Sequence, residues 1–477
     1  MKKICLYLFV LIFSTLSTVS KAQNISPVDF MRNNPRAAYA NPSFFTPEYG
    51  FFDFALGGIN IGVQNTGFRY KDLFDFNEAG QPVTLNLNKA VDGLRNTNNL
   101  NTFMDFDVFN CGRLTRHGFF TYSHRIRVME SFRFSKDLIE LLAQGNVAFM
   151  GADHPVNVDL GLSMKAYQEF NFGYQMCLTD KLNIGARFKF LIGAADAKSR
   201  NLKMQLVTNP ETYALSLSGD VDVLTSLPYD VSMNQGHLSV ADTRFNIANM
   251  FRNFGGGIDL GAEYRINDQF GVDAAINDLG FIRWNHSNAR FVAGIEDGGS
   301  FYQDGSFVFS GLTQDQLNGL MNESGYASNL MDSLFNYFNI HTVPMTGYTT
   351  GLNTKMMVRG YYDLTPSHRF SAQLMGYASG VGFRPALTLA YAGSYLDMFD
   401  VVTTYTMMKG SYGNVGLGLS ANFGGFLIYV ASNNVIGLFD PLNSRNLNLQ
   451  FGISFTGGDK INRSDRIVIK EASEEED

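Results

Sequence analysis

Hydrophobic and polar residues alternate along Val156–Cys177 for much longer than in an ordinary strand. Every second residue from Val156 to Ala166 is apolar, and apolar positions resume at Phe170 and continue to Met176. Successive side chains of a strand point to opposite faces, and ordinary strands have about five or six residues. A strand this long, with one oily and one charged face, suits either a large soluble sheet or a membrane barrel.

Similar runs recur along the chain and are joined by short turns. Alternation restarts at Leu182–Ile192, and further hairpins turn at Asn267-Asp268, near Pro366-Ser367 and at Gly424-Gly425. Fourteen strands are predicted, at 52–64, 101–112, 118–132, 157–177, 182–193, 254–266, 270–284, 351–362, 368–377, 383–391, 399–408, 414–422, 426–433 and 446–455. The number is even, as in single-chain bacterial barrels.

Long polar segments separate some of these hairpins, at about 65–100, 133–155, 194–253 and 285–350. Two contain helical patches, Ser135–Asn146 with a serine cap and Leu312–Asn339 with amphipathic spacing. If both termini are periplasmic, every long segment falls on the outer side and most tight turns on the inner side. Outer-membrane barrels have this asymmetry.

The two ends of the chain predict export and barrel closure. Lys2 and Lys3, the apolar run ICLYLFVLIF and small residues at Ser20 and Ala22 indicate a signal peptide cleaved after Ala22. The alternative, a membrane anchor helix, needs about 20 apolar residues, which is longer than this run. The last strand, NLNLQFGISF, resembles the assembly signal of outer-membrane barrels, although an acidic tail follows it.

These boundaries divide the chain into a signal peptide at 1–22, an N-terminal plug or periplasmic segment at 23–51, an all-β transmembrane antiparallel barrel at 52–455 and an acidic periplasmic tail at 456–477.

Composition favours the barrel over a soluble β-sandwich or β-helix adhesin. Charged residues make up 17% of the chain, against about 25% in soluble domains. The chain has 47 glycines, 42 phenylalanines and 22 tyrosines, which suit tight turns, strands and membrane interfaces. Mean hydropathy is only −0.07, because alternation halves the apparent hydrophobicity of a barrel strand.

The net charge argues against a nucleic-acid partner, and the cysteine content leaves one disulfide open. Removal of the three lysines of the signal would lower the formal net charge from −7 to −10, and no basic stripe suits a nucleic acid. Cys111 and Cys177 would remain, and an oxidising compartment leaves open whether they pair.

Several motifs resemble one group of proteins. They are NPSFFTP at Asn41–Pro47, DLIELLAQGN after a charged strand, TDKLNIGARFKFLIG after the long alternating run, and NFGGFLIYVASNN near the end. Together they resemble a branch of Bacteroidota outer-membrane proteins related to the FadL and PorV barrels. The resemblance implies a 14-stranded barrel with an N-terminal segment in its lumen. It also implies either uptake of hydrophobic molecules or service to the type IX secretion and gliding machinery.

Catalytic and metal-binding motifs are not found in the sequence. None of the seven histidines forms an i, i+4 pair, and the sequence has no Cys-x-x-Cys, nucleophile elbow or phosphate-binding loop. No cofactor, metal site or catalytic residue is therefore predicted. A barrel hydrolase that assembles its site from neighbouring strands would show no spacing signal, and an enzyme ranks last among the functions considered.

Charged residues on the predicted inner face are more informative. They are Asp105, Asp107, Arg125, Arg127, Asp159, Lys165, Glu169, Arg187 and Lys189. Acids and bases on adjacent strands should pair across the lumen. Their simplest role is a structural network that stiffens the wall and holds a plug, and the alternative is a polar gate on a solute path. The mixed signs do not suit a strongly ion-selective pore.

The segment before the first strand lacks periodicity. Because the lumen of a 14-stranded barrel is wider than side chains alone can fill, this segment is predicted to be a plug, with Asn41, Pro42, Phe44, Phe45 and Tyr49 among its residues. A disordered periplasmic lead is the alternative. The sequence thus favours, in the outer-membrane lipid, a plugged barrel that handles a hydrophobic ligand, ahead of a scaffold for secretion or gliding proteins. An open aqueous channel ranks third.

Overall fold

The computed structural model describes residues 25–31, 33–44, 50–75, 84–115, 118–151, 154–211, 214–228, 230–234, 237–241, 251–285, 288–293, 300–306, 340–379, 382–396, 398–408 and 411–457.

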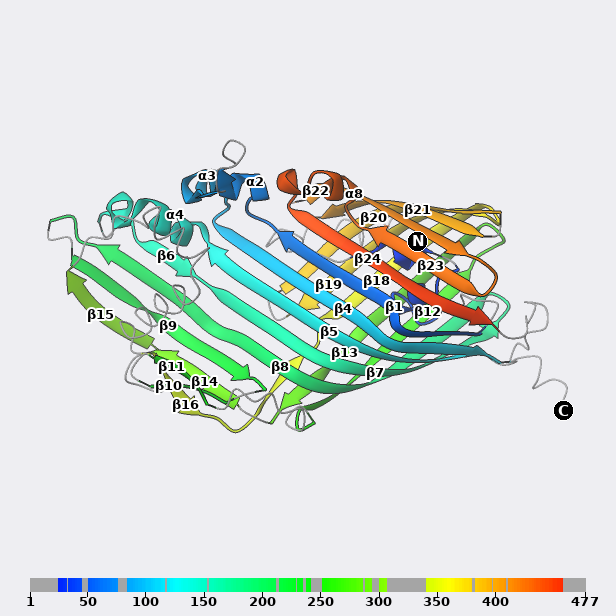
Figure 1. Ribbon diagram of the computed structural model, residues 1–477, viewed down its shortest axis with the longest axis horizontal. Coiled ribbons are helices and arrows are strands. Elements are labelled where there is room, and N and C mark those ends of the chain that lie inside the picture. Colours follow the sequence, from blue (N-terminus) through cyan, green and yellow to red (C-terminus); the bar gives the residue numbers. More distant parts are fainter. Residues whose placement is uncertain are drawn as a thin grey trace, which may run out of the picture.

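A closed ring of fourteen antiparallel strands forms the body of the molecule (Figure 1). In ring order they are β1 (Gly50–Asn65), β4 (Thr97–Leu114), β5 (Phe119–Ser135), β7 (Gly161–Thr179), β8 (Leu182–Thr208), β12 (Phe254–Arg265), β13 (Phe270–Trp284), β18 (Thr354–Thr365), β19 (His368–Ser379), β20 (Gly382–Tyr395), β21 (Phe399–Met408), β22 (Ser411–Asn422), β23 (Phe426–Ser432) and β24 (Asn446–Gly457). The pairing of β1 with β24 closes the ring.

The first strand begins and the last strand finishes at the same end of the barrel, since Gly50 pairs with Gly457 where β1 meets β24. We call this the turn end, because the short connections 115–118, 265–270 and 422–426 also lie there. The opposite end, called the loop end, carries the long connections, as the sequence predicted. Each of the fourteen predicted strands corresponds to a strand of the ring, and the bounds 270–284 and 399–408 match β13 and β21.

Three of the predicted long polar segments contain strands that the sequence did not reveal, and in two of them these strands are longer than two residues. β8 continues for 27 residues to Thr208, where it pairs with β9 (Ala214–Ser226), and β9 pairs in turn with β14 (Asn288–Ala293) and β15 (Ser300–Ser306). The others are β10 (Asp230–Asn234), β11 (His237–Ala241), β16 (Ile340–Pro344) and β17 (Tyr348–Gly351). β9, β14, β15 and β16 extend one side of the wall beyond the ring at the loop end, and β10 and β11 form a separate hairpin (Figure 1).

The predicted strand 157–177 is interrupted near its loop end. β6 (Val156–Asp159) stops before Leu160, and β7 begins at Gly161. Val156 and Val158 are buried, and β6 pairs with the distal part of β8 around Met204. The apolar residues at the start of this run therefore pack within the protein, so the prediction of one continuous strand is wrong there.

Short helices lie at the loop end. They are α2 (Tyr70–Leu73), α3 (Leu87–Gly93), α4 (Lys136–Gln144), α8 (Val435–Phe439), η3 (Asn146–Phe149) and η4 (Pro441–Asn443), beside the small hairpin of β2 (Phe74–Asp75) and β3 (Thr84–Leu85). α4 confirms the helix predicted at 135–146, with Ser135 at its N-cap. The helix predicted at 312–339 lies outside the described residues. In the described part of the chain, no helix is long and apolar enough to cross a membrane.

The outside of the ring is apolar and the inside polar. On β8, Phe188 is 59% exposed and Phe190 also faces out, whereas the alternate residues Arg187 and Lys189 are buried. On β13, Val272 and Ile276 are exposed while Asp273 is buried. A soluble protein has the opposite arrangement, so this exterior is suited to hydrocarbon.

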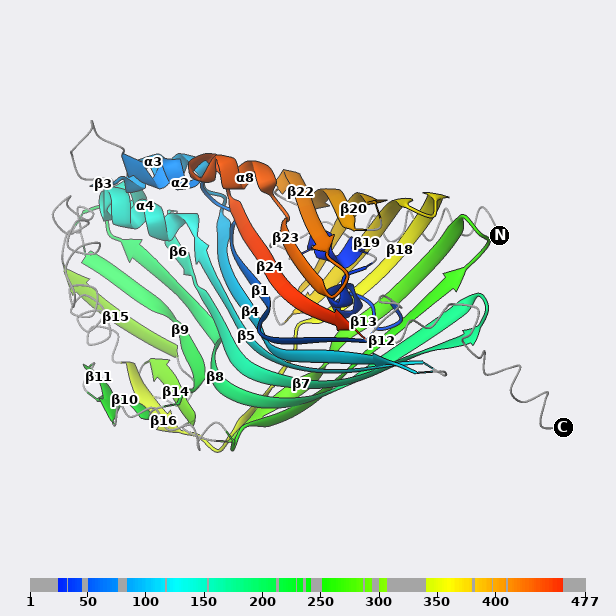
Figure 2. The same ribbon diagram turned by 45° about the vertical axis from the view of Figure 1, so that its right-hand side comes forward.

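The N-terminal segment 25–44 lies inside the ring, towards the turn end (Figure 2). Its two 3-10 helices are η1 (Pro27–Phe30), which begins with a Ser26 capping box, and η2 (Pro35–Tyr39), which is capped by Asn34. Its buried apolar residues pack against small lumen residues such as Ala386 and Ala390 of β20. The chain also approaches the wall closely, because a Cβ at Gly185 would overlap Pro42 and one at Gly261 would overlap Asn41. We call residues 25–44 the plug.

Candidate functional site

Arg36 attaches the plug to the strands that meet at the seam of the ring. Its guanidinium donates to Asp53 of β1 at 2.9 Å (Nη2), to Asp107 of β4 at 2.9 Å (Nε) and to Ser454 of β24 at 3.0 Å (Nη1). Arg36 is only 2% exposed. Residues 55–57 of β1 form a bulge between the positions paired with β4, which brings the backbone of β1 towards this side chain.

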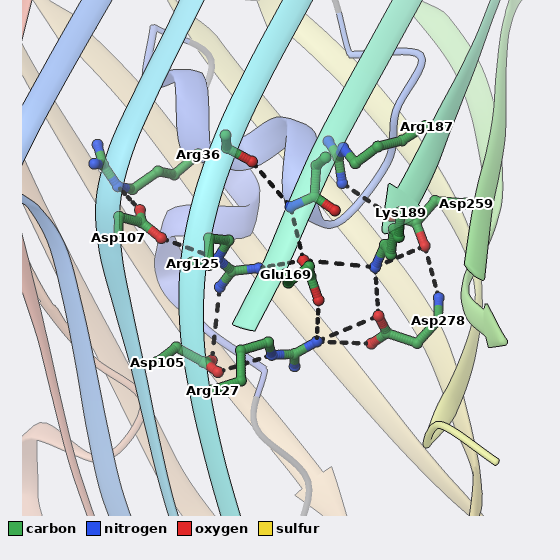
Figure 3. Close-up of polar contacts among 12 residues, drawn as sticks. Arg36, Asp105, Asp107, Arg125, Arg127, Glu169, Arg187, Lys189, Asp259 and Asp278 are labelled. Carbon is green, nitrogen blue, oxygen red and sulfur yellow. Dashed lines mark hydrogen bonds and ion pairs between the residues drawn. The ribbon is translucent and has the colours of Figure 1, made fainter. Parts of the chain in front are cut away.

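A network of buried charges continues from Arg36 across the lumen, and we call it the charged layer (Figure 3). Its members are Arg36, Asp53, Asp105, Asp107, Arg125, Arg127, Glu169, Arg187, Lys189, Asp259, Asp278 and Lys355. Acidic and basic groups are present in equal number. Because an unpaired buried charge is very costly, each member depends on its neighbours remaining in place.

Arg125 and Arg127 on β5 connect the acids of β4 to Glu169 of β7. Arg125 Nε donates to Asp107 at 2.9 Å, and Arg127 Nε donates to Asp105 at 2.9 Å. Glu169, which is fully buried, lies 3.6 Å from Arg125 Nη1 and 3.3 Å from Arg127 Nη1. These residues lie opposite one another in the β4–β5–β7 register, so strand pairing positions them.

Lys189 and Arg187 of β8, the strand next to β7, connect the layer to acids of β12 and β13. Lys189 Nζ contacts Asp278 and lies 2.9 Å from Asp259 Oδ1. Arg187 donates to Asp259 at 3.0 Å and, through its other nitrogen, to the carbonyl of Ala38 in the plug at 2.7 Å. The charged layer therefore binds the plug as well as the wall.

Asp278 reaches this layer because β13 changes its inward face at this residue. Asp273 and Asn277 point inward on odd positions, whereas Ile282 and Trp284 point inward on even ones. The change occurs at Asp278, whose φ is +59°, a left-handed conformation that Asp tolerates better than most residues. Here the β12–β13 register shifts by one residue. Such local strain is often retained at functional positions.

A second set of contacts fixes the other side of the plug. Arg359 of β18 donates twice to Asp273, at 2.8 and 3.1 Å, and once to the carbonyl of Asp29 at 2.9 Å. Asn41 of the plug donates to the same Asp273 at 3.0 Å, and Asn277 donates to the carbonyl of Ala40 at 2.6 Å.

Tyr39 fills the space between the plug and the charged layer. The Arg125 guanidinium lies 4.0 Å from the centre of its ring and that of Arg187 lies 5.0 Å away. An aromatic ring that contacts two guanidinium groups is a favourable cation–π arrangement.

In the plug itself, burial raises the pKa of Asp29 to about 6, against the lowering effects of Lys355, the Ser26 backbone and Arg359.

Above the charged layer, towards the loop end, the lumen is apolar. Seven residues form this apolar layer: Tyr167, Leu191, Leu224, Ile282, Trp284, Tyr348 and Leu352, with Met129 and Met345 packed against them. Leu191 comes two residues after Lys189 on β8, and Tyr167 two before Glu169 on β7, so the layers are adjacent. The polar atoms at its edge are paired, since Trp284 donates to Thr350 and Tyr348 to Asp196, both at 2.8 Å.

Seven of the nine predicted lumen charges meet in the charged layer, and two do not. Asp159 is half-exposed and forms an ion pair with Arg133 at 2.9 Å, because the wall is interrupted between β6 and β7. Lys165 is buried but donates to the carbonyl of Gly351 at 2.6 Å. A bulge at Ala166 and Tyr167 separates it from Glu169.

The predicted plug residues Asn41, Pro42 and Phe44 are buried in the lumen, and Phe44 lies against Arg359, whose guanidinium is 4.4 Å from the ring centre. Phe45 and Tyr49 lie outside the described residues, as do the proposed signal peptide and residues 458–477 of the tail. Cys111 and Cys177 are not joined by a disulfide.

The sequence did not lead us to several residues that hold the plug, either in the charged layer or in the contacts around Asp273. Asp259 and Asp273 lie on the inner faces of predicted strands, so the alternation could have identified them. Asp278 sits beside Asn277, and two adjacent polar residues within an alternating run were the available signal for the change of face. Arg36 had no such signal, because the plug lacks periodicity.

No group of three or more His, Cys, Asp and Glu side chains among the described residues is placed to hold a metal ion. The acids of the charged layer are instead bound to arginine and lysine. The described site therefore offers ion-pair and hydrogen-bond chemistry at the plug, with an apolar layer beyond it.

A closed antiparallel ring with an apolar exterior and a polar, plugged interior defines the class of outer-membrane β-barrels. Within that class, the chain belongs to a family of unknown function, DUF5723, whose pattern matches residues 42–433. A comparison of the sequence with curated proteins gives no match.

Solved barrels with a similar fold include three transport proteins or their homologues. They are the Pseudomonas putida toluene transporter TodX (9% identity, 92% of this chain and 98% of that chain, TM-score 0.40), a Pseudomonas aeruginosa FadL homologue (11%, 92% and 99%, 0.39) and the Ralstonia pickettii toluene transporter TbuX (10%, 91% and 98%, 0.40). At these low values, function has to be argued from this chain's own residues.

Proposed function

We propose that this protein is a plugged outer-membrane barrel that takes up a hydrophobic small molecule from its loop end. The observation that supports this proposal most is the apolar layer within the lumen. Membrane barrels normally have polar interiors, yet Leu191, Ile282 and Trp284 here are fully buried and face inward. Such a layer suits an apolar molecule better than a hydrated one, because apolar surface gains about 25 cal/mol per Å² on leaving water.

The charged layer argues against an open aqueous channel. Its acids and bases pair with each other, and the plug packs on its turn-end side. Six charges of each sign form no ring of one sign that could select an ion. Passage of any solute therefore requires the plug contacts to open, and we propose that occupancy of the apolar layer favours that opening.

The alternative of a scaffold for secretion or gliding proteins has no supporting observation among the described residues. Its proposed docking surface, 312–339, lies outside them. Export through a signal peptide cleaved after Ala22 remains part of the proposal, as does the absence of catalysis. Outer-membrane lipid is the expected surroundings of the exposed phenylalanines.

The single tryptophan of the chain, Trp284, reports directly on the apolar layer. The full-length protein in phosphatidylcholine nanodiscs is titrated with toluene and dodecanol, with glycerol as the polar control, while Trp284 fluorescence is recorded. We expect a saturable change with the two apolar probes only. Leu191→Ala should weaken it several-fold because it removes apolar surface that the probe would contact, and Leu260→Ala, which alters an exposed outer residue, should not.

Uptake by cells tests the same proposal in the membrane. Cells that produce the barrel should accumulate labelled toluene or dodecanol faster than cells that produce the Leu191→Ala variant at equal surface abundance. An unchanged Trp284 signal with every apolar probe, together with uptake no faster than in cells without the barrel, would contradict the proposal and favour the scaffold.

A further inference from the structure

A pocket of about 350 Å³ lies at the loop end, where the connection after β1 meets the connection between β23 and β24. Its lining residues are Arg69, Gly413, Asn414, Asn434, Ile436, Gly437, Asp440, Asn443, Ser444, Arg445 and Asn446. α2, α8 and η4 lie side by side there, and α2 contacts η4 (Figures 1 and 2). This rim pocket shares no residue with the charged layer or the apolar layer.

Positive charge dominates the rim pocket. Arg69 and Arg445 both line it, and neither guanidinium has an ion pair with a described residue. Arg95 and Arg69 lie close enough to act on the charge of Arg445, and the carboxylate of Asp72 offsets only part of their effect. The one carboxylate in the lining, Asp440, already accepts hydrogen bonds from the backbone and side chain of Asn443, at 3.3 and 2.7 Å. An anion in the pocket would therefore meet two arginines that form no direct ion pair with the described residues.

Two polar groups in the pocket are buried without satisfied hydrogen bonds. Nε of Arg445 has no partner among the described residues, and neither has Oδ1 of Asn446, a residue only 5% exposed. The amide nitrogen of Asn446 makes one long contact of 3.4 Å to Asn414. Because an amide can rotate to present its nitrogen instead, Asn446 can donate to the same group as Arg445. That rotation gives up the long contact to Asn414 and turns an unpaired acceptor into a donor, and buried polar groups such as these usually have a partner.

An apolar ridge borders the rim pocket. Ile436, which also lines the pocket, is 58% exposed, and Phe439 is 88% exposed, with Leu438 and Leu442 beside them. A short helix with so much exposed apolar surface next to unpaired arginines fits a molecule that has both an anionic and an apolar part. Free inorganic anions would use the arginines but not this ridge.

We propose that the rim pocket binds an anionic amphiphile. Its carboxylate or phosphate head would be held by Arg69, Arg445 and Asn446, and its apolar chain would lie along Ile436 and Phe439. Arginine recognises both head groups through paired N–H donors. The source is either a free amphiphile from outside the cell or a lipid of the outer leaflet. This site is separate from the luminal apolar layer and holds even if uptake does not.

Binding is measured with full-length protein in phosphatidylcholine nanodiscs, using labelled dodecanoate and dodecyl phosphate, with dodecanol as the neutral probe. Arg445→Gln should weaken binding of both anions at least about tenfold, the effect of losing a charge-assisted hydrogen bond, and leave dodecanol unchanged. Arg445→Lys should retain part of the affinity. Arg113→Gln, at an exposed arginine near the turn end, is the matched control and should bind as the parent does.

The source is identified by mass spectrometry of lipid retained when the protein is purified from native membranes. Phosphate-bearing lipid that is retained by the parent and lost from Arg445→Gln indicates an outer-leaflet lipid. Tight dodecanoate binding without retained lipid indicates a free amphiphile. Equal anion binding by parent and Arg445→Gln, with heat-modifiable gel mobility showing that both are folded, would overturn the proposal. The Trp284 signal with dodecanol is read in the same samples, so failure of uptake is seen separately.

Discussion

The charged layer and the apolar layer occupy neighbouring levels of one lumen, yet they are stabilised in opposite ways. In the charged layer each group depends on partners from other strands, as Glu169 depends on Arg125, Arg127 and Lys189. In the apolar layer, Ile282 is stabilised only by burial among other apolar side chains, with no specific partner. The first arrangement specifies one geometry, whereas the second tolerates changes of shape.

This difference suggests which layer opens and which one adapts. Paired buried charges contribute little net stability relative to apolar residues, but breaking one pair is costly. The charged layer can therefore behave as a two-state element that is either intact or broken. The apolar layer can accept ligands of different shapes at a gradual cost.

The largest effect is expected from Arg36→Ala. It leaves Asp53 and Asp107 buried with fewer positive partners, which should cost about 3–5 kcal/mol of plug docking. We expect the plug to leave the lumen and the barrel to conduct ions in planar bilayers, and we expect the parent not to conduct. Arg133→Ala, which breaks the half-exposed pair with Asp159, should cost less than about 1 kcal/mol and leave the barrel closed. A closed Arg36→Ala barrel would show that other plug contacts suffice.

Ile282→Ala tests the apolar layer in the same way. Removal of a fully buried side chain should lower the free energy of unfolding by about 2–4 kcal/mol through lost burial and a cavity. Because the charged layer stays intact, conductance should remain at the parent level. Heat-modifiable gel mobility measures the stability and the planar bilayer measures the conductance. If Ile282→Ala conducts, the two layers are not independent.

A smaller effect is expected from pH. The pKa of Asp29 is about 6 in the folded protein, mainly because of burial, against an ordinary value of 3.8. Between these values the docked plug binds a proton that the released plug does not, so docking should strengthen as pH falls from 7 to about 5. The amide of Asn does not titrate in this range. Asp29→Asn should therefore show a weaker pH dependence of thermal stability between pH 7 and about 5. An identical dependence in both proteins would assign the effect to other groups.

The barrel could be predicted from the sequence because its wall separates hydrocarbon from a polar lumen. That separation requires a period of two, and the period placed all fourteen strands, including the bounds of β13. It could not reveal β9 or β14, because strands outside the hydrocarbon have no apolar face to repeat. The interruption at Leu160 was hidden for a related reason, since buried and lipid-facing residues there are equally apolar.

The site was predictable only where side chains follow the strand period. Arg125, Glu169 and Lys189 were found because pairing in register puts inner-face charges beside each other. Asp278 was missed because a left-handed residue changes the inward face of its strand. Arg36 was missed because its position comes from the irregular plug and from the β1 bulge, neither of which has a repeating pattern.

Arg36 also bears on how the molecule assembles. Asp53 and Ser454, two of its partners, belong to β1 and β24, the first and last strands of the ring to be synthesised, and these strands are neighbours only once the circle is complete. If the ring closes around an empty lumen, the hydrogen bonds from Arg36 to Asp53 and Ser454 cannot form. If it closes around the N-terminal segment, both bonds form together. The side chain that attaches the plug in the finished barrel would thus also favour closure of the ring with the plug already inside.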